Sequence, residues 1–286
     1  MSKFNIPILS FEEQRQIGSL LRTLDDRIAL LRDTNTTLEA IAQAMFKSWF
    51  VDFDPVHAKQ QGRTPEGMDE ATAALFPDSF EESELGLVPK GWEVDTVYNI
   101  STVIYGAPFA SSKFNTDQLG KPLIRIRDLK DEAPGTYTDE IHPKGYLVQP
   151  GDIVVGMDGE FRAYLWGGQP AWLNQRVCVF APKLGVSSAF VRLSITSLLA
   201  AVEASETATT VIHLGKNDID RFRVRIPDAK VLEEFGNRVN TLYEKIVESK
   251  LMAATLSSLR DTLLPRLISG QLRLPEAATA LKEATA

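Results

Sequence analysis

Three charged side chains in the middle of the chain could form a reactive site, judged by their type and spacing. Asp152, Glu160 and Arg162 have a spacing that loosely resembles that of a metal-dependent nuclease. The stretch Pro150-Gly151-Asp152, however, is typical of a turn that opens a strand. Because the turn explains these residues better, we do not expect nuclease activity.

The other residue types that carry chemistry lack the spacing of a catalytic or metal site. The three histidines (His57, His142 and His213) lie far apart and without the HExxH pattern. The single cysteine, Cys178, excludes an internal disulfide and a cysteine-based zinc site, and it suits a reducing cytoplasm. The sequence has no Asn-Pro-Pro-aromatic stretch, no glycine-rich cofactor loop after a strand and no Walker lysine loop. We therefore expect no catalytic residues, no metal and no cofactor in this chain.

The composition is that of a folded protein whose negative charge lies mostly in its first third. Of 286 residues, 44% are hydrophobic and 24% are charged, with a net charge of −7. Residues 1–89 carry 8 basic and 15 acidic residues, whereas residues 90–228 carry 15 and 16. The near-neutral middle permits a local DNA-binding face but excludes a wholly basic DNA-coating protein. Because there is no run of 18 apolar residues and no signal peptide, we expect no membrane helix and a cytoplasmic location.

Two long helices are predicted, one at each end of the chain. In each, apolar residues recur at alternating spacings of four and three, which is the heptad seam of a coiled coil. Ser10 is the expected N-cap of the first helix, with Glu13 completing a capping box, and Pro265 should kink or end the second. The seams are Ile17, Leu21, Leu24, Ile28, Leu31, Asn35, Leu38, Ala42, Met45 and Trp49, then Phe235, Val239, Leu242, Ile246, Ser249, Ala253, Leu256, Arg260, Leu263 and Leu267. The two seams have the same spacing at every position, which indicates a repeated helical spacer. The alternative is ordinary packing of both helices on the middle domain.

Between the helices, the sequence predicts a connector and then a domain of strands and turns. Residues 54–90 mix proline, glycine and acidic residues, with one short helical piece near residues 69–75. Further along, alternating or continuous apolar residues predict strands at 122–129, 153–155, 176–182 and 218–226, and a helix at 188–204. The middle is therefore expected to be a compact mixed α/β domain with much β structure.

Several segments, in this order and spacing, resemble the specificity subunits of type I restriction–modification enzymes. The resemblance covers residues 5–270. Each segment is weak alone, and together they are specific. The segments are IPILSFEEQRQIGSLLRTLDDRI, NTTLEAIAQAMFKSWFVDFDPV, GRTPEGMDEATAALFPDSFEESELGLVPKGWE, QPGDIVVGMDG, LNQRVCVFAP and TLLPRLISGQL.

The resemblance implies a fold, a role and a set of partners. The expected fold is α+β, a mixed α/β target-recognition domain with substantial β-sheet, flanked by two long antiparallel coiled-coil spacer helices. The subunit would read DNA without catalysis, while modification subunits methylate adenine with S-adenosylmethionine and restriction subunits use ATP and Mg. The expected boundaries are 1–53 for the first helix, 54–90 for an irregular connector, 91–228 for the recognition domain, 229–270 for the second helix and 271–286 for a flexible tail.

The chain departs from the family pattern because it has one recognition domain where the family normally has two. It resembles the second half of a full subunit. A second recognition domain would come from another copy or from another polypeptide. If two copies pair, symmetry predicts a DNA site of two identical, inverted half-sites.

Side chains suited to double-stranded DNA occur on several predicted loops and one predicted strand. Lysine and arginine hold phosphates, whereas arginine and short polar side chains also read base edges. On the strand predicted at 122–129, Arg125 and Arg127 share one face, which suits a DNA surface; a solvated strand face is the alternative. The candidate set is Ser112, Lys113, Arg125, Arg127, Lys130, Asp158, Arg162, Asn174, Gln175, Arg176, Lys216 and Asn217.

The first helix ends in an aromatic stretch that an ordinary surface helix does not need. Its rings are Phe46, Trp49, Phe50 and Phe53. We expect them to pack partly on this chain and partly on a modification subunit. The alternative is that all four form the core of the junction between helix and domain.

Two other functional classes stay open at this point. A helical scaffold that binds only proteins would not lose DNA affinity when Arg125 and Arg127 become alanine. A regulator would occupy modification subunits without directing methylation.

Overall fold

The structure is a computed structural model that describes residues 9–205 and 212–284. The chain divides into two compact units, one formed by Met1–Thr37 with Glu248–Ala286 and the other by Leu38–Val247. Helices α1 (Phe11–Phe50) and α6 (Ala229–Ile268) contribute residues to both units. Each unit has hydrophobic clusters of its own.

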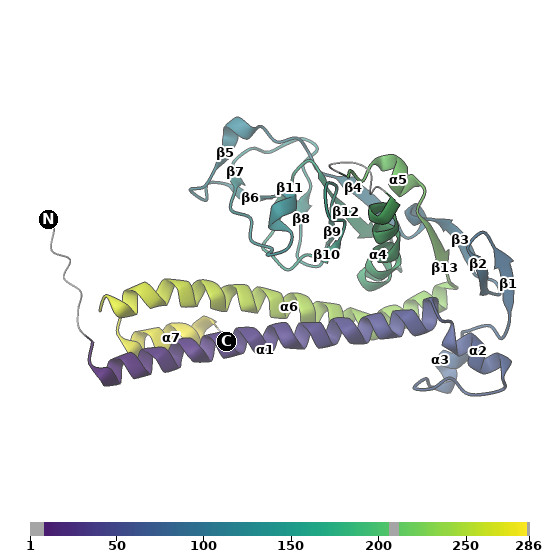
Figure 1. The fold of residues 1–286 in the computed structure, drawn as a ribbon, viewed down its shortest axis with the longest axis horizontal. Helices are drawn as coiled ribbons and strands as arrows, with labels where there is room; N and C mark the ends of the chain where they lie inside the picture. The colour runs from purple at the N-terminus through teal and green to yellow at the C-terminus, as the bar shows by residue number, and fades with distance from the viewer. Residues whose placement is uncertain (1–8, 206–211, 285–286) are drawn as a thin grey trace. The chain divides into compact units, whose positions relative to one another are not determined.

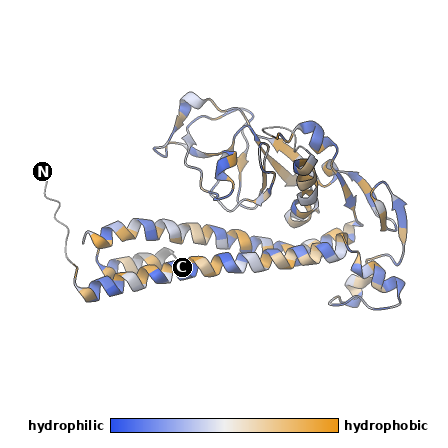
Figure 2. Cartoon of the chain, in the orientation of Figure 1, coloured by the Kyte–Doolittle hydropathy of each residue, from blue (hydrophilic) through white to orange (hydrophobic). Residues whose placement is uncertain are grey.

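The helical unit pairs the first part of α1 with the last part of α6. Ile17 packs near Leu263, whereas Leu24, further along α1, packs near Leu256, so the two helices are antiparallel. An ion pair of 2.7 Å joins Arg260 to Asp25 across the same pair. Figure 2 shows apolar and polar residues alternating along both helices, as a seam requires.

The predicted seams are confirmed, since no member of either seam is exposed. The capping box is also present, with the Ser10 N–H donating to Glu13 Oε2 at 2.8 Å and the Glu13 N–H donating to Ser10 Oγ at 3.2 Å. Pro265 does not end α6, which continues to Ile268.

The end of the chain differs from the flexible tail expected at 271–286. Helix α7 spans Leu274–Ala284 and lies beside α1 and α6 (Figure 1). Its Ala277 is fully buried in a cluster with Ile17 and Leu263. The short apolar face of α7 is stabilised by this packing, which the local sequence does not reveal.

The second unit contains two main sheets and two two-stranded sheets. One main sheet has the strand order β10-β9-β12-β4, and the other has the order β5-β7-β6-β11-β8. The strands of the first are β4 (Ser101–Tyr105), β9 (Ile153–Gly156), β10 (Ala163–Leu165) and β12 (Val177–Pro182). Those of the second are β5 (Phe114–Asn115), β6 (Lys121–Ile124), β7 (Tyr137–Thr138), β8 (Leu147–Val148) and β11 (Ala171–Leu173). The small sheets pair β1 (Phe80–Ser83) with β2 (Gly86–Pro89), and β3 (Glu93–Thr96) with β13 (Arg223–Ile226).

The central strands are buried on both faces, which explains their continuous apolar runs. In β9, Ile153 and Val155 enter the larger core cluster, whereas Val154 enters a second cluster. In β12, Cys178 belongs to the larger cluster and Val179 to the second. Alternate side chains of one strand thus serve two different cores.

Helix α4 (Ser188–Ser205) covers the larger core. By length and composition alone it could cross a membrane, contrary to the expectation that no segment would qualify. Five of its apolar residues are buried within this unit, and 28% of the helix is buried. They are Ala189, Phe190, Val191, Ile195 and Leu199.

The connector is more ordered than the irregular segment expected at 54–90. It contains α2 (Asp54–Gln60), α3 (Glu70–Ala74) and the antiparallel β1–β2 pair. Asp69 caps α3 by accepting the Thr72 N–H at 2.9 Å, and it also forms a 2.8 Å ion pair with Arg238 of α6. Hydrogen bonds from Thr72, with a smaller effect of Arg238, lower the pKa of Asp69 to about 2.

The buried cysteine allows a direct test of the core. Cys178 is fully buried on β12, and burial raises the pKa of its thiol to about 12. The thiolate is the reactive form, so a buried thiol with a raised pKa reacts poorly. We expect iodoacetamide to leave the folded chain unmodified over hours and to alkylate it within minutes in denaturant, measured by mass spectrometry. Rapid alkylation of the native chain would contradict this core.

Candidate nucleic-acid interface

The candidate interface is an edge where three loop segments meet, after β9, before β12 and around the start of α5 (Lys216–Asp220). We call it the loop edge and define it as residues 157–159, 174–176 and 212–217. The Met157 N–H donates to the Arg176 carbonyl at 2.9 Å, and the Leu214 N–H donates to the Met157 carbonyl at 2.7 Å. These backbone bonds hold segments far apart in sequence side by side.

Asp158, Arg176 and His213 form a polar cluster on the loop edge. Asp158 Oδ1 lies 2.6 Å from His213 Nδ1 and 3.3 Å from Arg176 Nη1. Arg176 has a φ of 71°, a conformation that is uncommon for residues other than glycine. Its side chain is 58% exposed, so the guanidinium is both anchored by a carboxylate and open to solvent. An accessible, oriented guanidinium suits bidentate contact with guanine in the major groove.

Further candidates lie on the same edge. Gln175, Lys216 and Asn217 are exposed, whereas Asn174 is buried. Lys216 forms a 2.8 Å ion pair with Asp220, which also accepts the Tyr98 hydroxyl at 2.6 Å. The hydrogen bonds from Lys216 and then Tyr98 lower the pKa of Asp220, so the carboxylate that anchors Lys216 stays ionised. The structure therefore gathers Asp158, Asn174, Gln175, Arg176, Lys216 and Asn217 from the predicted set.

The prediction that Arg125 and Arg127 share a strand face is wrong. Strand β6 ends at Ile124, and residues 126–128 form a short 3₁₀ helix. The cause is local: the side chain of Asp128 accepts the Arg125 N–H at 3.0 Å and so favours a turn over a continued strand. The Arg125 side chain is only 25% exposed and hydrogen-bonds Thr136, so it supports this turn.

Four other predicted DNA contacts are not part of the loop edge and stay predictions. Arg127 is 70% exposed beside Asp128, and Lys130 is exposed just after the same turn. Ser112 and Lys113 are exposed on a 3₁₀ turn, Ser111–Lys113, that precedes β5. Within the described residues, Lys113 and Lys130 form no ion pair, which leaves both available for phosphates.

Arg162 forms its ion pairs with carboxylates outside the loop edge. Its guanidinium pairs with Glu160 at 2.8 Å and with Glu203 of α4 at 2.7 Å. It also lines a cavity beside α4, together with Tyr164 and Lys47. A side chain held there by two carboxylates is poorly placed to act with the loop edge.

Asp152, one of the two carboxylates that suggested a nuclease, has a structural role. Asp152 accepts the Gln149 N–H at 2.8 Å and the Tyr146 hydroxyl at 3.0 Å, closing the turn before β9. Burial raises the pKa of Asp152, and the two hydrogen bonds oppose that rise. Among the described residues, there is no group of three acidic, histidine or cysteine side chains that could hold a metal ion.

The aromatic end of α1 packs mainly within its own unit. Trp49, Phe50 and Phe53 are 5%, 3% and 7% exposed, so the expected contact with a modification subunit is corrected for Trp49 and Phe53. Phe50 also lines a small pocket, so for this ring partner contact stays a prediction. The ring centroid of Phe50 lies 4.9 Å from that of Phe235 and 5.0 Å from that of Phe190. Phe46 is only half-buried, and for this ring partner contact stays a prediction.

Two residues that shape the loop edge, one within it and one beneath it, are not revealed by the sequence. His213 meets Asp158 only through the fold, and a lone histidine carries no pattern. Gly106 follows β4, and a Cβ atom there would lie 1.9 Å from the backbone oxygen of Asn174. Only glycine allows this approach, which seats the 174–176 segment; one glycine after a strand does not reveal it.

Comparisons with known proteins agree with this architecture. Residues 89–251, more than half of the chain, match the family model described as the type I restriction modification DNA specificity domain. The chain is 28% identical to the type I restriction enzyme HindI specificity subunit of Haemophilus influenzae, over 95% of this chain and 70% of that one. It is 26% identical to the MjaIX specificity subunit of Methanocaldococcus jannaschii, over 96% of this chain and 62% of that one.

A solved structure shares the fold. The S subunit of a type I restriction–modification system from M. genitalium superposes with a TM-score of 0.55 at 15% identity, covering 90% of this chain and 61% of the other. The chain thus spans between about three fifths and seven tenths of these relatives. The match to the family model shows that this chain belongs to the family of type I restriction modification DNA specificity domains.

Proposed function

We propose that this chain is a DNA sequence-recognition subunit that directs adenine methylation and restriction by partner subunits. The observation that carries the proposal is the loop edge, an exposed polar edge built on a domain of the DNA specificity family. Arg176, Gln175 and Asn217 supply the donors and acceptors that base reading needs. The chain acts without catalytic residues of its own.

The proposed partners follow from this role. Modification subunits carry S-adenosylmethionine, and restriction subunits carry the ATP and Mg chemistry, all in the cytoplasm. A second copy of this chain supplies the second recognition domain. An isologous pair of copies would then recognise two inverted, identical half-sites.

The decisive experiment is methylome sequencing of cells that express this chain with its cognate modification subunit. Cells with the modification subunit alone are the control. A methyladenine motif that appears only with this chain supports sequence recognition, and a palindromic motif supports two copies acting together. If the complex forms but no motif appears, the chain is a scaffold or regulator and the proposal fails.

The loop edge predicts a specific effect for one arginine. Arg176→Ala should weaken binding to the methylated motif about tenfold or more, because one bidentate base contact contributes roughly 1–3 kcal/mol of discrimination. Binding to a scrambled duplex should change much less. Fluorescence anisotropy with both duplexes measures the difference.

Lys113→Ala is the comparison for this prediction. An exposed lysine without an acidic partner is suited to bind phosphate. Its loss should therefore weaken binding to both duplexes alike and reduce the slope of log affinity against log salt concentration by about 1. Equal weakening of both duplexes by Arg176→Ala would assign Arg176 to phosphate and contradict base reading.

A further inference from the structure

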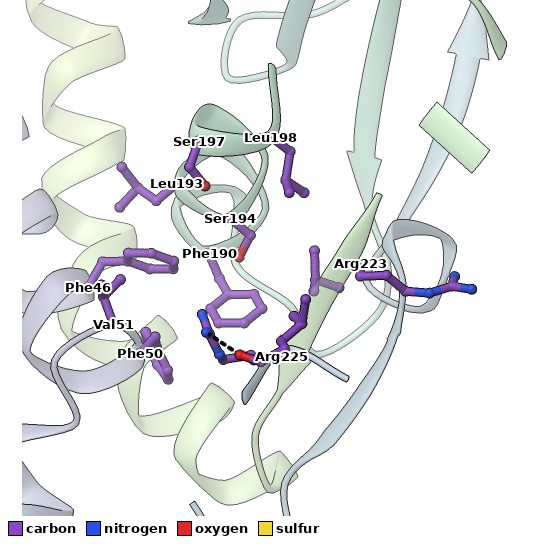
Figure 3. Close-up of a pocket in the computed structure, with 12 residues that line it drawn as sticks. Phe46, Phe50, Val51, Phe190, Leu193, Ser194, Ser197, Leu198, Arg223 and Arg225 are labelled. Carbon is purple, nitrogen blue, oxygen red and sulfur yellow. Dashed lines mark hydrogen bonds between the residues drawn. The ribbon is translucent and has the colours of Figure 1, made fainter. Parts of the chain in front are cut away.

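A small pocket opens on the second unit between the end of α1, α4 and β13 (Figure 3). Its volume is about 180 Å³. The walls are mostly apolar, with Phe46, Phe50 and Phe190 on one side and Leu193 and Leu198 of α4 above. None of these residues is needed by the loop edge.

Arg225 brings a positive charge to this apolar pocket. Its Nη2 donates to the Leu85 carbonyl at 3.4 Å, and its guanidinium carbon lies 5.6 Å from the ring centroid of Phe53. Within the described part of the chain, no carboxylate pairs with Arg225, and its Nε lacks a hydrogen-bond partner. Partial burial also lowers the pKa of this guanidinium. Because the Nε is buried, a carboxylate from outside would pair with the other guanidinium nitrogens, whose positive charge no acidic group among the described residues balances.

The neighbouring arginine provides a contrast. Arg223, two residues earlier on β13, forms a 3.0 Å ion pair with Glu84. Arg223 also lines the pocket, but Figure 3 shows its guanidinium pointing away, whereas that of Arg225 points in among the rings. The charge of Arg223 is therefore already balanced within the chain.

The size and rim of the pocket fit a protein side chain. An apolar cavity of about 150 Å³ is enough to bind benzene, so this pocket has room for one large apolar side chain. The rim stays apolar and open: Val51 is 48% exposed, and Phe46, Leu193 and Leu198 are half-buried. An apolar rim around a half-buried arginine is the composition of a binding hot spot between proteins.

A second cavity extends the same surface. It measures about 710 Å³ and shares Phe46, Val51, Leu193 and Ser197 with the pocket. Its arginines are already paired, Arg192 with Glu39 at 3.4 Å and Arg162 with two glutamates. The surface can therefore receive a segment longer than one residue, while its uncompensated charge lies at Arg225.

We infer that this pocket docks a partner protein through one large apolar side chain and an adjacent carboxylate that pairs with Arg225. The inference rests on the proposed function in taking the modification subunit as that partner. It assigns the docking site to the end of α1 and the outer face of α4, apart from the residues proposed to read DNA.

Two variants test the pocket by different means. Ser194→Phe should fill it from α4, and Arg225→Gln should remove the charge while keeping a hydrogen-bonding side chain. The matched controls are Ala201→Phe, exposed on the same helix outside the pocket, and Arg223→Gln, the balanced arginine. The full-length chain and the purified modification subunit are titrated by isothermal calorimetry, and the melting temperature of each variant is recorded.

Both test variants should weaken binding of the modification subunit at least tenfold, and both controls should weaken it less than twofold. All four variants should have melting temperatures close to that of the unaltered chain. If Arg225→Gln disturbs the packing of Phe53, Ser194→Phe still tests the pocket, because it leaves that contact intact. Unchanged affinity in Ser194→Phe overturns the inference, as does the dissociation of a self-dimer by Ser194→Phe, which would make a second copy the occupant.

DNA binding by the isolated chain is measured in parallel, because it separates this inference from the proposed function. Variants that still bind DNA and still bind the modification subunit with full affinity contradict the pocket alone. An unaltered chain that binds neither DNA nor the modification subunit contradicts the proposed function, and the docking inference fails with it.

Discussion

Replacing Phe50 by alanine is expected to lower the free energy of unfolding of the second unit by about 3–5 kcal/mol. Phe50 is 3% exposed and packs edge-on against Phe190 of α4 and Phe235 of α6, with centroid distances of 5.0 and 4.9 Å. It also contacts Trp92 at 5.8 Å. Removing the ring opens a cavity where three segments meet, and rigid aromatic neighbours close such a cavity poorly.

The measurement is urea unfolding of the full chain followed by tryptophan fluorescence. The four tryptophans (Trp49, Trp92, Trp166 and Trp172) belong to the unit that contains Phe50, so the signal reports that unit. Leu87→Ala is the control, because Leu87 is 59% exposed and its loss should cost less than about 0.5 kcal/mol. Similar losses for both variants would show that Phe50 does not lie in a packed core.

The aromatic end of α1 shows what a sequence reveals about a core. Four large rings close together indicate that this end of the helix must be covered. The pattern does not name the cover, because periodicity defines a face and not its partner. Phe190 and Phe235 complete the cluster from far along the chain, so the sequence alone does not distinguish an internal partner from another subunit.

The long helices were predictable for the opposite reason. Their seam depends on a spacing repeated many times, so no single residue decides it. The turn after β6 depends on one side chain, since Asp128 accepts the Arg125 N–H and ends the strand. Alternation of apolar and charged residues reads the same in a strand and in this turn, which is why Arg127 was misplaced.

The sequence predicts which residue types form the candidate interface, but not which of its segments meet in the fold. The segments around Asp158, Arg176 and Lys216 were identified from their loops and polar side chains. Their meeting depends on backbone bonds between residues far apart in sequence, such as Leu214 to Met157. For the same reason, Arg162 was grouped with them although Glu203 holds it elsewhere.

The second large effect is expected at Gly106, which follows β4 and lies against the backbone of Asn174 in the loop edge. The Gly106 N–H donates to the Val177 carbonyl, and the Ala107 N–H donates to the Leu173 carbonyl, both at 3.0 Å. A Cβ atom at Gly106 would lie 1.9 Å from the backbone oxygen of Asn174 and 2.4 Å from its carbonyl carbon. Because the obstacle is backbone, no side-chain rotation relieves it.

Gly106→Ala should therefore displace the 174–176 segment and break some of these bonds. We expect a loss of about 3 kcal/mol in the free energy of unfolding, at the upper end for overpacking. Under the proposed function, we also expect a larger loss of motif-specific DNA binding than Arg176→Ala causes, since Asn174, Gln175 and Arg176 move together. Urea unfolding and anisotropy with the motif duplex measure the two effects separately.

Gly135→Ala is the matched control, because a Cβ atom there meets no atom within 4 Å. It should leave stability and binding nearly unchanged. Gly106→Ala with normal stability and normal motif binding would show that the 174–176 segment is not seated on Gly106. A variant that loses stability but keeps motif-specific binding would separate the close approach from recognition. Loss of both, with Arg176→Ala losing only specificity, would tie base reading at the loop edge to the backbone contact beneath it.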